Sequence, residues 1–80
     1  MAKRRVMFTF PPGLIGEPII YRLGRHFNVV TNIRRADISD DRGWVVLELE
    51  GEEEDIERGI AWVTATGVRV DPATGDVVEG

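Results

Sequence analysis

The sequence predicts a single α+β domain in which a four-stranded antiparallel sheet carries two helices on one face. Two patterns lead to this prediction. Short stretches that alternate apolar and polar residues are typical of strands with one buried face. Two other stretches repeat apolar residues at helical spacing, and they fall between the strands in the order βαββαβ.

The first strand is predicted over residues 5–10, where Val6, Phe8 and Phe10 lie on the buried face. The prolines that follow end this strand, because proline has no N–H to donate to a neighbouring strand. A helix is predicted over residues 18–27, since proline suits the first helical position and an apolar stripe follows it at helical spacing.

The second and third strands are predicted over residues 29–38 and 44–50, joined by a polar loop. If Asp41 lies at the centre of this loop, Arg34 lies opposite Glu48 across the hairpin. Opposite charges that face each other on neighbouring strands support this register.

The second helix is predicted to begin in the acidic stretch 52–55, because carboxylates suit the positive end of a helix dipole. Its apolar stripe includes Ile56 and Val63. It ends near Gly67, since glycine is the preferred residue just after a helix. A short last strand is predicted over residues 68–70.

These elements predict a ferredoxin-like βαββαβ fold, because right-handed crossovers place both helices on the same face of the sheet. The predicted domain covers residues 1–71. Residues 72–80 are predicted to form a disordered acidic tail.

The sheet face that no helix covers is the predicted contact surface. Strand alternation places Met7, Val30, Trp44 and Val46 on that face, among polar and charged residues. Exposed apolar patches mark interaction sites, and tryptophan is a frequent interface anchor. We therefore expect these four residues to form an interface, with a symmetric homodimer as the simplest assembly.

The size and composition of the chain favour self-association. A chain of 80 residues forms a small core, and domains of this size usually gain support from disulfides, metals or oligomerisation. The chain has no cysteine, which excludes disulfides and thiolate metal sites. The absence of cysteine, of a membrane-spanning stretch and of a signal peptide predicts a cytoplasmic protein.

No catalytic set or cofactor site is predicted. His26 has no partner for acid–base or nucleophilic chemistry, and the acidic stretch 50–57 lacks the glycine and spacing of a calcium loop. Residues 11–16 share only glycines with a phosphate loop. Nucleic-acid binding is disfavoured, because the net charge is −4 and the open face offers Trp44 as its one aromatic.

The chain resembles the NIL domain, which is found at the carboxyl end of the ATPase subunit of bacterial methionine-import ABC transporters. The matching stretches are short but occur in order between residues 5 and 71. They are Phe8-Thr9-Phe10, Glu17-Pro18-Ile19-Ile20, Arg25-His26-Phe27-Asn28-Val29, Asn32-Ile33, Leu47-Glu48-Leu49-Glu50-Gly51, Ala61-Trp62 and Gly67-Val68-Arg69-Val70.

The resemblance implies an ACT-related domain that dimerises and binds methionine between two copies, as a regulator of transport. The family's motif asparagine corresponds to Asn32, followed by Ile33, and the third position is Arg34 where the family has an apolar residue. We therefore expect Asn32, Ile33 and Arg34 to contact a small amino acid, with Arg34 either binding a carboxylate or pairing with Glu48. The alternative is a structural or adaptor protein that docks on itself or on another protein without a ligand.

Overall fold

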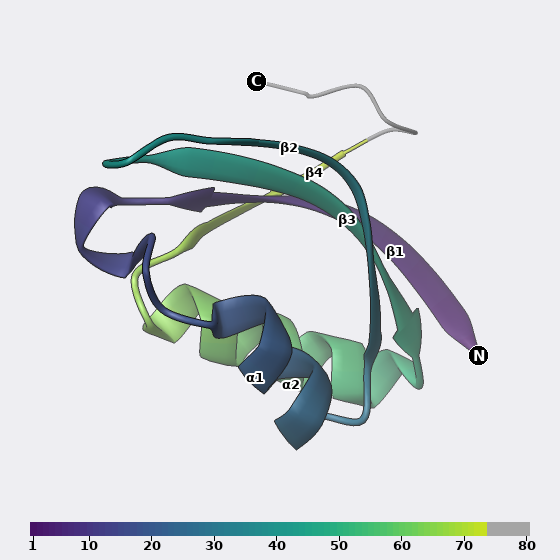
Figure 1. Cartoon of the computed structure of the whole chain (residues 1–80). Coiled ribbons are helices and arrows are strands. Elements are labelled where there is room, and N and C mark those ends of the chain that lie inside the picture. Colours follow the sequence, from purple (N-terminus) through teal and green to yellow (C-terminus); the bar gives the residue numbers. More distant parts are fainter. Residues whose placement is uncertain (74–80) are drawn as a thin grey trace.

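The structure is a computed structural model that describes residues 1–73 (Figure 1). Its elements are β1 (Ala2–Phe10), the 3-10 helix η1 (Pro12–Leu14), α1 (Ile19–His26), β2 (Val30–Ile38), β3 (Gly43–Gly51), α2 (Glu53–Ala65) and β4 (Arg69–Pro72). The predicted βαββαβ order is confirmed, with η1 as one addition in the connection between β1 and α1.

The strands form one antiparallel sheet in the order β2-β3-β1-β4. Both helices lie on the same side of this sheet (Figure 1). The predicted ferredoxin-like α+β fold is therefore confirmed. The core fills the space between sheet and helices, and its buried members are Val6, Phe8, Phe10, Ile19, Leu23, Val29, Val45, Leu47, Leu49, Ile56, Val63 and Val68.

Two residues with positive φ end the helices. Asn28, which follows α1, has a φ of 53°, and Gly67, which follows α2, has a φ of 107°. Asparagine and glycine adopt this left-handed region more readily than other residues, and they commonly stop a helix there. The predicted helix end at Gly67 is confirmed.

A β-bulge at Arg34 interrupts the ladder between β2 and β3. Ile33 pairs with Leu47, but the next pair along the ladder is Arg35 with Val46, so that Arg34 is an extra residue on β2. A bulge of this kind changes which face the following side chains occupy. From Arg35 onward, β2 therefore has the opposite alternation from the one that a regular strand would have.

The predicted register of the β2–β3 hairpin is wrong. Glu48 lies opposite Asn32 rather than opposite Arg34. Its carboxylate instead accepts a hydrogen bond from Arg5 on the other neighbouring strand, at 3.3 Å between Nε and Oε2. The loop closes through the Ser39 N–H, which donates to the carbonyl oxygen of Arg42, so its centre is half a residue before the expected position.

The last strand extends beyond its predicted end at residue 70. Pro72 belongs to β4, and the N–H of Ala73 donates to the carbonyl oxygen of Arg5. The remainder of the predicted tail, residues 74–80, lies outside the described residues.

Candidate functional site

Three of the five exposed large hydrophobic residues among residues 1–73 lie on strand β2. It is an edge strand, and eight of its nine residues are exposed. The exposed fractions are 60% for Val30, 55% for Ile33 and 59% for Ile38. Edge strands with exposed apolar side chains tend to pair with another chain, and natural proteins usually cover or blunt them. Strand β2 is therefore the first candidate for an interaction surface.

The three predicted ligand residues are consecutive on this edge strand. Asn32 lies opposite Glu48, on the sheet face away from the helices, whereas Ile33 lies opposite the buried Leu47, on the helix side. Arg34 is the bulge residue, and the alternation of side chains along β2 reverses after it. The structure thus keeps the three residues together on β2 but does not direct them into one common pocket of the protomer.

The predicted contact surface on the open sheet face is largely buried. Met7 is 8% exposed and Val46 is 0% exposed, while Trp44 is half-buried and only Val30 is well exposed. Met7 and Val46 face each other on the two central strands, so each has cross-strand neighbours on both sides. Met7 and Val46 are therefore not exposed as expected, whereas an interface that involves Val30 and Trp44 stays a prediction.

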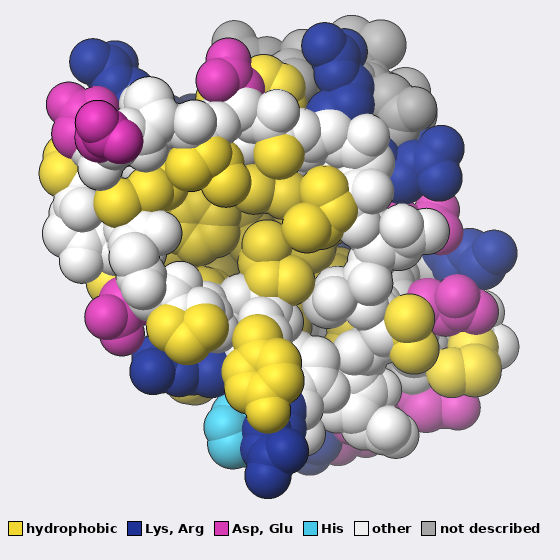
Figure 2. Space-filling view, viewed as in Figure 1, with side chains coloured by type: hydrophobic (Ala, Val, Ile, Leu, Met, Phe, Trp, Pro, Cys, Tyr) yellow, Lys and Arg dark blue, Asp and Glu magenta, His cyan; other side chains and the backbone are white. Residues whose placement is uncertain are grey.

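An apolar pocket lies between the start of α1 and the end of β2, on the helix side of the sheet. Figure 2 shows hydrophobic side chains gathered in a hollow between β2 and the helices. The pocket has a volume of about 180 Å³, smaller than the sites that hold drug-sized ligands. Its lining residues are Phe10, Ile15, Glu17, Pro18, Ile19, Ile20, Tyr21, Ile38 and Val45.

The one charged residue in this lining is Glu17, and it is paired. An Arg22 Nη1 atom lies 3.2 Å from Glu17 Oε1, and both side chains are roughly half exposed. The pocket therefore combines apolar walls with a carboxylate and a guanidinium near its rim. This pocket could not be predicted from sequence patterns, because its lining joins Glu17, which precedes α1, to Ile38 at the far end of β2.

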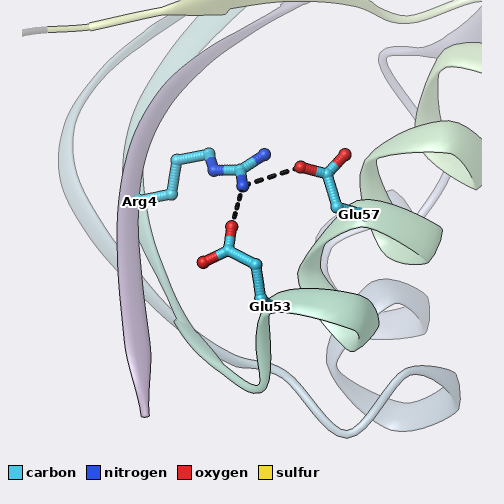
Figure 3. A network of polar contacts seen from close by, with 3 residues as sticks. All are labelled: Arg4, Glu53 and Glu57. Carbon is cyan, nitrogen blue, oxygen red and sulfur yellow. Dashed lines mark hydrogen bonds and ion pairs between the residues drawn. The ribbon is translucent and has the colours of Figure 1, made fainter.

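Arg4 ties strand β1 to the start of α2. Its guanidinium contacts the carboxylates of Glu53 and Glu57, the latter at 2.8 Å (Figure 3). The hydrogen bond that Arg4 donates to Glu57 is the main reason why the pKa of Arg4 is raised, and Glu53 adds to it while partial burial opposes it. The two glutamates are more than half exposed, so this network is a modest structural tether.

The remaining titratable candidates have surface positions. His26 is exposed in the last turn of α1. In the predicted acidic stretch, Asp55 and Glu54 pair with Arg58. Within the described residues, no group of three or more histidine, cysteine or acidic side chains could hold a metal ion. Neither helix of the described part is long and apolar enough to cross a membrane.

The fold and the strand register define a ferredoxin-like α+β domain with an exposed edge strand. The sequence pattern of the NIL domain matches residues 4–72, and the chain belongs to the NIL domain family. No match was found among the curated proteins.

Solved structures share the fold. The C-terminal domain of an ABC transporter ATP-binding protein from Enterococcus faecalis has a TM-score of 0.78 and 22% sequence identity, with 86% of this chain and 81% of that chain covered. The de novo designed protein Ferredog-Diesel has a TM-score of 0.56 and 16% identity, covering 88% of this chain and 84% of the design. The design Foldit4 has a TM-score of 0.55 and 13% identity, covering 91% and 96%. These likenesses concern the fold alone.

Proposed function

We propose that this chain is a non-catalytic regulatory module that binds a small amino acid, methionine or a similar one, at a homodimer interface made by β2. The observation that carries the proposal is the exposed edge strand itself, which bears Asn32 and Ile33 and ends at an apolar pocket. Membership of the NIL domain family supports the regulatory role. A cytoplasmic location belongs to the same proposal, because the related solved domain comes from an ATP-binding protein.

The dimer in this proposal forms by antiparallel pairing of β2 with β2 of a second copy. Such pairing satisfies the backbone hydrogen-bonding groups along the edge and removes Val30, Ile33 and Ile38 from water. It also extends the core of a small domain, which gains stability from association. Two-fold symmetric pairing is the commonest form of homodimer.

Pairing of this kind would complete the ligand site. Antiparallel strands run in opposite directions, so the first half of β2 in one copy lies beside the second half of β2 in the other. Ile33 of a second copy, on the helix side of the sheet, would then approach the strand end where Ile38 lines the pocket, while Asn32 of that copy would lie on the opposite face. This arrangement explains why the motif and the pocket lie apart within one protomer.

The chemistry of the pocket suits a small amino acid with an apolar side chain. The apolar walls would accept a thioether or aliphatic chain. At the rim, Glu17 would accept hydrogen bonds from the ligand's ammonium group, and Arg22 would donate to its carboxylate.

Ligand binding is tested by thermal unfolding in the presence of each of the twenty amino acids. A ligand at a hundred times its dissociation constant stabilises the folded state by about 2.7 kcal/mol, which gives a clear rise in Tm. Arg22→Gln, which removes the guanidinium expected to bind the ligand's carboxylate, should reduce the rise, while Thr64→Ala, at an exposed position on α2, should keep it. If no amino acid raises the Tm at millimolar concentration, the ligand-binding proposal is wrong.

The interface is tested by sedimentation velocity. Ile33→Lys places a charge on the edge strand at an exposed position, so the fold should persist while the dimer dissociates. Trp44→Glu is the matched control on the open sheet face and should leave the association state unchanged. If Trp44→Glu dissociates the dimer and Ile33→Lys has no effect, the interface lies on the open sheet face and not on β2.

A structural or adaptor role without a ligand is the second candidate. It is favoured by Arg34, which is charged and interrupts the edge strand with a bulge. A dimer that dissociates on Ile33→Lys but shows no Tm rise with any amino acid would support this role.

A further inference from the structure

A second hollow lies on the sheet face away from the helices, at the loop end of the β2–β3 hairpin. It has a volume of about 290 Å³, larger than that of the pocket beneath α1, and the two share no lining residue. Its lining residues are Thr9, Asp37, Ser39, Arg42, Gly43 and Trp44.

Trp44 forms the centre of this hollow. In the sheet register, Trp44 lies directly between Thr9 of β1 and Asp37 of β2. Direct cross-strand neighbours have their Cβ atoms about 5 Å apart, so the Asp37 carboxylate lies within reach of the indole. The bulge at Arg34 is what brings Asp37 to this face, because without the extra residue the alternation of β2 would direct Asp37 toward the helix side.

Asp37 contributes the carboxylate in the lining of this hollow. It makes no ion pair with any residue of the described part, 1–73. The neighbouring polar groups have partners: Arg42 Nε lies 4.0 Å from Asp41 Oδ1, and the Ser39 hydroxyl donates to the Arg42 carbonyl oxygen at 3.1 Å. Arg42 is 81% exposed and extends toward solvent. The hollow thus combines a carboxylate that forms no ion pair within residues 1–73 with a half-buried indole.

We propose that this hollow binds a guanidinium group, from an arginine side chain of another protein or from a small alkylguanidine. A guanidinium is planar, so it stacks on an indole face and donates two parallel hydrogen bonds to a carboxylate. The stacking contributes about two- to fivefold in affinity at an exposed site. The hydrogen bonds to the charged carboxylate contribute about tenfold or more. This site is independent of the amino-acid pocket and opens on a different face.

The test uses the fluorescence of Trp44 in the full chain carrying Trp62→Phe, so that one tryptophan reports. Trp62 is half-buried against Phe27 on the helix side, and phenylalanine preserves that packing. The chain is titrated with ethylguanidinium chloride at constant ionic strength. Its neutral counterpart N-ethylurea, which has nearly the same shape without the charge, is titrated in parallel.

We expect a saturable change in Trp44 emission with ethylguanidinium and none with N-ethylurea. Asp37→Asn should weaken the binding about tenfold, whereas Asp41→Asn, which alters a neighbouring carboxylate outside the lining, should not weaken it. Thermal melts of both variants show that each is folded. Equal responses to the cation and to ethylurea, or binding that survives Asp37→Asn, would overturn the proposal.

The same titration separates the two sources of the guanidinium. A short peptide with one arginine that binds more tightly than ethylguanidinium assigns the hollow to a protein partner. Weaker binding of the peptide assigns it to a small alkylguanidine. A peptide in which lysine replaces arginine should bind more weakly than the arginine peptide, because an ammonium cannot stack and donate in parallel in the same way.

Discussion

At the scale of single residues, Gly59 sets how closely the two helices approach. It lies in the buried face of α2, and a Cβ atom at this position would come within 2.6 Å of Leu23 Cδ1 and 3.6 Å of Phe27 Cβ. Leu23 is fully buried, so its side chain has no open space into which to move. The glycine therefore weakens the helix locally but permits the contact between α1 and α2.

We expect Gly59→Ala to lower the free energy of unfolding by about 1 kcal/mol. The gain in helix propensity is about 1 kcal/mol, and overpacking of a core costs about 1 to 3 kcal/mol, so the loss is the larger effect. Chemical denaturation measures the difference. Gly13→Ala is the control, because nothing lies within 4 Å of the added Cβ there, and it should change stability by less than about 0.5 kcal/mol. A Gly59→Ala chain more stable than the parent would show that Leu23 repacks without cost.

At the scale of elements, the bulge in β2 decides which side chains reach which surface. It places Arg35 and Asp37 on the open face, opposite Val46 and Trp44. Bulges often lie beside functional sites, where they redirect a side chain. The bulge of β2 follows directly after Asn32 and Ile33, the residues expected to contact a ligand.

Deletion of Arg34 tests whether the bulge serves stability or function. Without the extra residue, Ile33 and Arg35 become neighbours on a regular strand with their present faces, so the chain should fold with a stability change below about 1 kcal/mol. The amino-acid-induced rise in Tm, by contrast, should disappear, because the edge of β2 changes its twist. Thermal melts with and without ligand measure both effects. Retention of the full ligand response in the deletion variant would show that the bulge has no part in the site.

The order of the elements could be predicted from sequence, because periodicity and breakers such as Gly67 are local signals. The bulge could not be predicted, because nothing in residues 30–38 distinguishes a regular strand from one with an extra residue. The extra residue becomes evident only in the pairing of β2 with β3. The burial of Met7 and Val46 was missed for a similar reason. Alternation tells on which face a side chain lies, but it does not tell how far that side chain is exposed. Asn32 and Ile33 were placed correctly on one strand, while the pocket beneath α1 depends on contacts distant in sequence.

At the scale of the whole molecule, the exposed edge and the small core point to association as part of the stability. Residues 1–73 contain 14 buried hydrophobic residues, which is a small core for a chain of 80. Three of the exposed large apolar residues lie on β2. We expect the Tm to rise with protein concentration, because a dimer links folding to association by mass action. Differential scanning calorimetry over a hundredfold range of concentration measures the effect. A constant Tm would contradict the homodimer, while the guanidinium site on the open face would remain unaffected.

The core described above contains no buried polar or charged side chain among residues 1–73. A group that titrates inside a protein can act as an internal switch, since its change of charge disturbs the packing around it. The interior of residues 1–73 has no such group, so a change of pH between mild acid and mild base alters no charge within the core. Any change of charge with pH in residues 1–73 therefore falls on groups at the surface of the domain.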